Sequence, residues 1–164
     1  MASRGFVLMA VGLAVVAALL FFLFGVTTGA HLRLEGKILK VRVYQQPSSG
    51  ASLVFADFRV ANPSDVPFVV DSVKLTLVPA SGDPSDANAI AKVDTENVFR
   101  YVKILGPKYN DVLAGHDRIL PHQTVDRMAG ARFEAPESAV DGRKSLRIEI
   151  AGVDGAVAEI TESK

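Results

Sequence analysis

Histidine and aspartate side chains gather in one stretch of the chain, and these residue types bind divalent metals. His116 and His122 lie six residues apart, with Asp111, Asp117 and Asp126 close to them in the sequence. A zinc site needs converging ligands at characteristic spacing and further groups that orient them. The six-residue spacing matches no established signature. We therefore interpret both histidines as exposed loop residues and predict no metal.

A second candidate for metal chemistry is the sequence GDPSDAN, where Asp83, Asp86 and Asn88 could offer oxygen ligands to Ca²⁺. The ligand spacing of an EF-hand and its terminal glutamate are missing. We expect a solvated turn at this position.

Catalytic groups are not arranged in any recognisable frame. The chain has no cysteine, which excludes thiolate nucleophiles, disulfides and zinc-thiolate sites. No G-x-S-x-G, P-loop or G-x-G-x-x-G motif occurs. We predict a protein that is not an enzyme and has no cofactor.

The charge balance also bears on partners. The chain carries 18 basic and 18 acidic residues, and all of them except Arg4 are interspersed after residue 30. A domain without excess positive charge gives no electrostatic reason to expect a nucleic-acid partner.

Aromatic and apolar residues cluster around position 100. Phe99, Tyr101, Ile104 and Tyr109 lie close together in the sequence. Such a group can cap a core or present a docking surface to a partner. Both interpretations stay open, and these four residues are candidate partner-binding residues.

The elements that must position these residues are mostly strands. Apolar and polar residues alternate with a period of two through most of the chain after residue 31, as half-buried strands require. The expected strands span residues 32–44, 53–61, 68–78, 125–134, 146–150 and 156–161. The segments 79–88 and 111–122 are expected to be irregular.

One segment departs from this alternation. Val98, Tyr101, Val102 and Leu105 recur at helical spacing, and Gly106 lies where a helix typically ends. We predict a short helix over about 95–105. A strand is the alternative, because the segment is rich in β-forming residues.

Strands at this spacing predict an antiparallel β-sandwich of immunoglobulin or fibronectin III type over residues 31–164, with the short helix inserted. The fold class predicted for the whole chain is mainly β, with a single N-terminal transmembrane helix before the sandwich.

The transmembrane prediction rests on 25 consecutive uncharged residues, Phe6 to Ala30. About 20 apolar helical residues span a bilayer. We expect a retained anchor over residues 1–30, and a cleaved signal peptide ending at Ala30 is the alternative. The predicted location is a single-pass membrane protein with a cytoplasmic N-terminus and an extracytoplasmic or periplasmic domain. Basic residues between Arg33 and Arg42 leave a reversed orientation open.

Small residues at Ala10, Ala14 and Ala18 recur every four positions within this segment. Such spacing lets helices approach closely in lipid. These alanines are candidate partner-binding residues, and the expected partners are membrane lipid, other membrane proteins or a second copy of the chain.

A family resemblance adds to this interpretation. The run FADFRVANPSDVPFVVDSVKLTL, which begins at Phe55 and contains Asn62-Pro63, resembles type 2 late-embryogenesis-abundant (water-stress, WHy) domains. The run LPHQTVDRMAGARFEAP, which begins at Leu120, is similar to a segment of bacterial immunoglobulin-like domains of unknown function. The resemblance implies a β-sandwich that is not an enzyme, and it assigns no catalytic residues.

The function expected from the sequence is a membrane-anchored β-sandwich with a binding or structural role at the cell envelope. The alternative is an accessory subunit of an integral membrane complex, anchored by its helix and covering the outer face of that complex.

Overall fold

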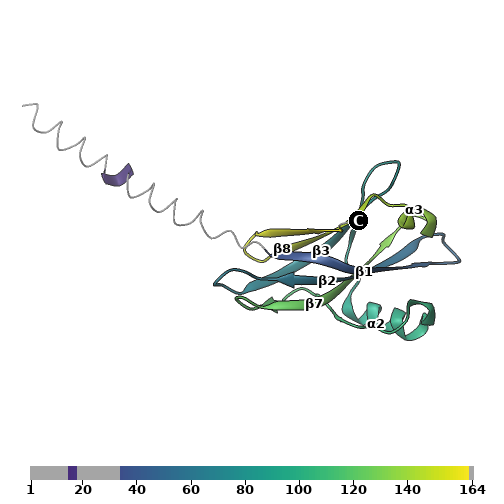
Figure 1. Ribbon diagram of the computed structural model, residues 1–164, viewed down its shortest axis with the longest axis horizontal. Helices are drawn as coiled ribbons and strands as arrows, with labels where there is room; N and C mark the ends of the chain where they lie inside the picture. The colour runs from purple at the N-terminus through teal and green to yellow at the C-terminus, as the bar shows by residue number, and fades with distance from the viewer. Residues whose placement is uncertain (1–14, 18–33, 163–164) are drawn as a thin grey trace, which may run out of the picture. The chain divides into compact units, whose positions relative to one another are not determined.

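The period-two alternation forms two facing β-sheets in the computed structural model, which describes residues 15–17 and 34–162 (Figure 1). The chain divides into two compact units, residues 1–31 and 32–164, and both sheets belong to the second. The first sheet has the order β1-β2-β7-β5, formed by Glu35–Gln45, Ser52–Ala61, Thr124–Phe133 and Asp111–Val112. The second has the order β4-β3-β8-β9, formed by Ser85–Asn88, Phe68–Val78, Ser145–Gly152 and Val157–Thr161. The predicted mainly β class is confirmed.

The main core lies between the two sheets. Alternate residues of each strand point into it, so that β2 contributes Phe58, β3 contributes Phe68 and β7 contributes Phe133, each no more than 1% exposed. These strands bury one face because their apolar residues recur every second position. The sheet order alone does not distinguish an immunoglobulin or fibronectin III type from other two-sheet folds.

The middle of the chain does contain a helix. Helix α2 spans Lys92–Tyr101 and is followed by a 3-10 turn, η1, over Lys103–Leu105. Gly106 then takes a φ of 72°, a left-handed conformation that glycine adopts at little cost. The helix therefore begins before the predicted residue 95, and α-helical geometry ends at residue 101. A short helix α3, Glu137–Asp141, occupies the turn before β8.

Two segments expected to be irregular contain short strands. Residues 85–88 form β4, which pairs antiparallel with Lys74–Leu77 of β3. Residues 111–122 contain β5 and a second two-residue strand, β6 (Arg118–Ile119). Strand β6 pairs with β3, whereas β5 runs parallel to β7. These strands show no alternation of apolar and polar residues in the sequence, because they are short and lie at sheet edges, where polar residues are common.

The transmembrane part of the predicted fold class requires correction. Among the residues that the structure describes, no helix is long and apolar enough to cross a membrane. Helix α2 has 10 residues, and at 1.5 Å per residue it covers only about half of a bilayer core. Of the predicted anchor, only residues 15–17 are described, and they are helical. The predicted transmembrane helix and the predicted single-pass membrane location are therefore not retained, and Ala10, Ala14 and Ala18 lie outside the described residues.

Candidate partner-binding surface

A second apolar cluster lies on the outer face of the first sheet, under α2. The Phe55 and Phe99 rings meet edge to face, with centroids 4.9 Å apart, a favourable arrangement for aromatic pairs. The buried members of the cluster are Leu53, Phe55, Phe99, Leu105 and Met128. Strand β2 is therefore buried on both faces where α2 covers it, because Val54 and Ala56 face the main core.

Gly130 of β7 makes the room that this packing needs. Any Cβ at position 130 would lie 2.4 Å from Cδ1 of Phe55, closer than atoms can approach without displacement. The Phe55 ring therefore lies across a residue without a side chain. Because the Phe55 ring lies close to the backbone of the sheet, α2 can also pack close to the sheet.

A buried ion pair connects the sheet to the segment after α2. Arg42 of β1 donates from Nη2 to Oδ2 of Asp57 on β2 at 2.7 Å, and both side chains are under 10% exposed. From Nη1, Arg42 also donates to the carbonyl oxygens of Leu105 at 3.2 Å and Pro107 at 2.8 Å. Asn110 donates to the other carboxylate oxygen of Asp57 at 2.8 Å. We call Arg42, Asp57 and Asn110 the clamp.

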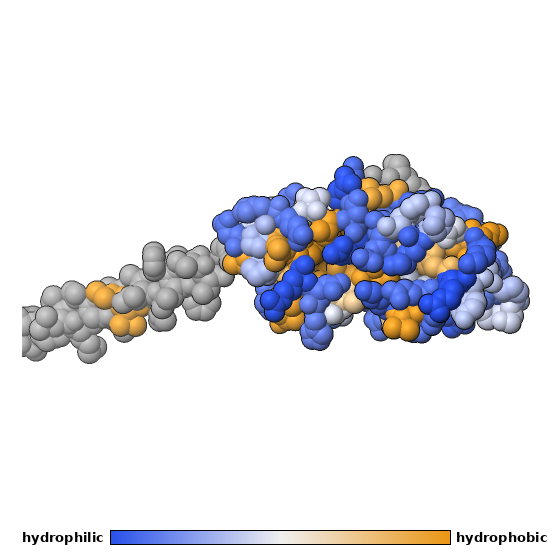
Figure 2. Space-filling model, turned by 90° about the horizontal axis from the view of Figure 1, so that it is seen from below, coloured by the Kyte–Doolittle hydropathy of each residue, from blue (hydrophilic) through white to orange (hydrophobic). Residues whose placement is uncertain are grey.

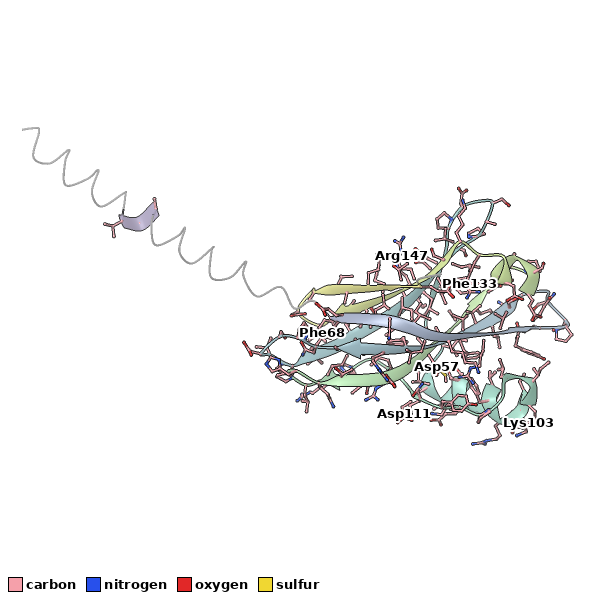
Figure 3. All side chains as sticks on the ribbon, viewed as in Figure 1. Asp57, Phe68, Lys103, Asp111, Phe133 and Arg147 are labelled. Carbon is pink, nitrogen blue, oxygen red and sulfur yellow. The ribbon has the colours of Figure 1, made fainter. Side chains whose placement is uncertain are left out.

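The planar guanidinium suits this position. It lies over the Phe99 ring at 4.6 Å from the centroid while its nitrogens reach both the carboxylate and the carbonyls. Arginine can stack on a ring and donate in several directions at once, which lysine cannot do. The clamp thus fixes residues 105–110 on the sheet, and Figure 3 shows Asp57 on the side of the sheet toward α2.

Three large side chains within or just before this clamped segment project into solvent. Tyr101 is 76% exposed, Ile104 is 84% exposed and Tyr109 is 64% exposed. We call these three residues the tyrosine patch. Figure 2 views the domain from the side on which Figure 1 places α2, and it shows hydrophobic residues among hydrophilic ones. Large apolar side chains exposed in a group are typical of interaction sites.

Positive charge surrounds the tyrosine patch. Lys40 lies with its Nζ 5.6 Å from the centroid of the Tyr109 ring. Arg100 and Lys103 are exposed on either side of Tyr101, and neither forms an ion pair with any described residue. Lys108 donates to Asp111 at 3.2 Å, and this hydrogen bond and the lysine charge hold the pKa of Asp111 below its ordinary value.

The four candidate residues predicted near position 100 separate into two roles. Phe99 is only 8% exposed and belongs to the second apolar cluster. Tyr101, Ile104 and Tyr109 lie on the surface. Core packing and surface exposure thus both occur in one segment, but on different residues.

The clamp does not follow from the sequence pattern. Arg42 and Asp57 alternate with apolar residues, so the alternation places them on a solvated face. One signal was available: Leu53 to Ala56 is continuously apolar, which indicates a strand buried on both faces. Such a strand needs a covering layer, and charged residues beside it must then find partners.

The candidate metal ligands lie apart from one another. His122 places Nε2 2.9 Å from Oδ1 of Asp65 at an exposed loop. Asp86 accepts from the Thr76 hydroxyl at 2.7 Å, which lowers the pKa of that carboxyl. Within residues 15–17 and 34–162, no group of three histidine or carboxylate side chains is arranged to hold a metal ion.

The Asn62-Pro63 pair has a structural role. The buried Asn62 side chain donates to the carbonyl oxygens of Val66 at 2.8 Å and Ile119 at 3.0 Å. Its Oδ1 accepts from the backbone and hydroxyl of Ser64. Asn62 therefore closes the β2–β3 loop and connects it to β6.

Fold and surface together define a two-sheet β-sandwich with a helical layer on one outer face. No protein-family model matches this sequence, and neither does any curated protein. Two similar solved structures are an X-ray structure of a Northeast Structural Genomics Consortium target and one described as "Putative ApaA Protein from Bordetella pertussis". The first is 10% identical with a TM-score of 0.42, covering 79% of this chain and 82% of that chain. The second is 14% identical with a TM-score of 0.36, covering 79% and 88%.

TM-scores below 0.5 at such identities support neither a shared fold nor a shared activity. The resemblance to type 2 late-embryogenesis-abundant domains accordingly stays a prediction.

Proposed function

We propose that this domain is a protein-binding module without enzymatic activity, and that it docks a partner through the tyrosine patch. The observation that carries the proposal is the exposure of Tyr101, Ile104 and Tyr109 within or just before residues 105–110, which the hydrogen bonds of the clamp fix on the sheet. A rigid surface loses little conformational entropy on binding, so more of its contact energy becomes affinity. Tyrosine suits such surfaces because it combines an apolar ring with a polar hydroxyl.

The arrangement of the layer supports the proposal further. Phe99 and Leu105 complete the packing against the sheet, so the tyrosine patch is not needed to bury that face. An isolated exposed apolar residue is ordinary, whereas three within the short stretch from Tyr101 to Tyr109 form a candidate contact area. A subunit of a larger assembly and a free-standing binding protein are both forms of this function.

Site-specific photo-crosslinking tests the proposal on the full chain in its native cells. A benzophenone amino acid replaces Ile104 in one variant and Val157 of β9 in the control. Val157 is also well exposed, at 57%. We expect a discrete protein adduct from position 104 and none of that mass from position 157.

A Tyr101→Ser substitution should weaken the adduct from position 104 without changing the unfolding midpoint. If positions 104 and 157 give the same adducts, or if neither gives any, the tyrosine patch is not a docking surface.

A further inference from the structure

The charges around the tyrosine patch carry information about the partner. Between residues 99 and 110 the chain has three basic residues, Arg100, Lys103 and Lys108, and no acidic residue. Lys40 adds a fourth positive charge from β1, beside Tyr109. The chain as a whole is neutral, with 18 basic and 18 acidic residues, so this local excess is a feature of one surface.

Two cations on the opposite sheet are paired with carboxylates of the chain itself. On β3, Lys74 lies 3.5 Å from a carboxylate oxygen of Asp86 and 3.7 Å from one of Glu149. On β8, Arg147 lies 3.0 Å from a carboxylate oxygen of Glu159. Arg118 of β6, beside β3, is exposed and forms no ion pair with any described residue, so the pairing on that sheet is incomplete. Around the tyrosine patch, Lys40, Arg100 and Lys103 have no such match among the described residues.

From these unmatched cations beside exposed aromatic residues we infer that the partner presents an acidic segment, with carboxylates placed beside apolar or aromatic anchors. The inference rests on the proposed function, because it names the chemistry of the partner at the same surface. The anchors contact Tyr101, Ile104 and Tyr109, and the carboxylates lie opposite Lys40, Arg100 and Lys103. Charge complementarity of this kind selects the partner and accelerates association. Figure 3 shows Lys103 at the outside of the α2–η1 layer, where a carboxylate can reach it.

The four positive charges have different availability. Lys108 is engaged with Asp111 and 23% exposed, so it contributes mainly to the local potential. Arg100 and Lys103 are exposed and lie next to Tyr101 and Ile104 in the sequence, and neither is engaged in an ion pair among the described residues, so the inference assigns direct contact to these two cations. The hydroxyl groups of Tyr101 and Tyr109 can donate to the same carboxylates.

The test measures binding of a defined probe to the full chain. The probe is a fluorescein-labelled 12-residue peptide with alternating glutamate and leucine or phenylalanine, and its matched control carries glutamine in place of glutamate. Fluorescence anisotropy is recorded at low and at high salt. We expect the glutamate peptide to bind at least about tenfold more tightly than the glutamine peptide at low salt, with the difference shrinking as salt screens the charges.

Charge-reversed variants locate the site. Lys103→Glu and Arg100→Glu should each weaken binding of the glutamate peptide by about three- to tenfold. Lys144→Glu, at an exposed turn before β8, is the matched control and should leave binding unchanged. Lys103→Gln repeats the test with a smaller perturbation, and unfolding curves confirm that the variants are folded.

Equal binding of the two peptides, or equal loss in Lys144→Glu, would overturn the inference. Binding of phosphatidylglycerol vesicles that depends on Lys103, without peptide binding, would assign the surface to anionic lipid and overturn it as well. Failure here is distinguishable from failure of the proposed function. If the crosslinked adduct from position 104 persists unchanged in Lys103→Glu, the tyrosine patch is still a docking surface, but the inference of an acidic partner is rejected.

Discussion

At the scale of single residues, the clamp is the most consequential arrangement. Burying two charges costs several kcal/mol per ion before their attraction is counted. Here each charge has further partners, since Arg42 reaches two carbonyl oxygens and Asp57 accepts from Asn110. Removing one member leaves the other charge buried and uncompensated, which is more damaging than removing both.

Arg42→Met is therefore expected to lower the free energy of unfolding by about 3–5 kcal/mol. The double variant Arg42→Met/Asp57→Leu should recover part of that loss, because no buried charge remains. Urea unfolding followed by circular dichroism measures both. Arg59→Met, which breaks an exposed pair with Asp126, is the control and should cost no more than about 1 kcal/mol. An Arg42→Met effect as small as that of the control would contradict a buried clamp.

At the scale of elements, α2 is a separate layer with its own apolar contacts. Its inner side carries Phe99, while Tyr101 at its end faces solvent. These two aromatic residues, two positions apart, therefore have opposite expected effects on stability and on binding.

Phe99→Ala should cost about 3–5 kcal/mol of stability, because it removes a ring that packs against Phe55 in a buried cluster. Tyr101→Ala should stay within about 0.5 kcal/mol, as expected for an exposed side chain without a special role. Urea unfolding of both variants distinguishes the roles. Comparable losses in the two would show that Tyr101 also supports the fold.

The elements also show what sequence reasoning can recover. Long strands such as β2, β3, β7 and β8 are visible because a buried face imposes alternation over many residues. Two-residue strands such as β5 have too few residues to show any period, and their pairing depends on distant β7. For the candidate site, the clustering of apolar and aromatic residues near position 100 was enough to predict Tyr101, Ile104 and Tyr109 as candidates. The clamp was not, because it joins residues up to 65 positions apart.

At the scale of the whole molecule, residues 32–164 form one compact unit with two apolar clusters. The chain contains no cysteine, so stability depends on packing and hydrogen bonds rather than on covalent links. A fragment of this size normally unfolds in one cooperative transition.

We expect a fragment of residues 32–164 to fold alone into a β-rich domain with a single urea transition. Coincident curves from far-ultraviolet circular dichroism and tyrosine fluorescence would support this expectation. A fragment that aggregates or shows no transition would indicate that the rest of the chain or a partner is required.

Acid should destabilise this domain in a defined range of pH. Asp86, Asp111 and Asp126 all have a pKa lowered from the ordinary value of 3.8, through hydrogen bonds from Thr76, Lys108 and Arg59 respectively. A lowered pKa in the folded state means that the unfolded chain binds more protons near the ordinary pKa, so this stabilisation is present above it.

Stability should therefore hold from pH 7 to about 5 and then decline as pH falls through the lowered pKa values. Urea midpoints measured along this series test the expectation, and Asp126→Asn should make the decline shallower. Because all three carboxyls are at the surface, high salt should reduce the effect. A midpoint that rises below pH 4 would contradict it.

The separation of the two apolar clusters has a consequence for local unfolding. The main core lies between the sheets and does not include α2, so the α2–η1 layer can detach while the sandwich stays intact. Such an opening uncovers Leu53, Phe55 and Met128 on a sheet face, which is a surface prone to aggregation. Amide hydrogen exchange would detect this opening as faster exchange in α2 than in β2. Because the clamp holds the segment after α2 on the sheet, its strength determines how often this layer opens and exposes the apolar sheet face to other molecules.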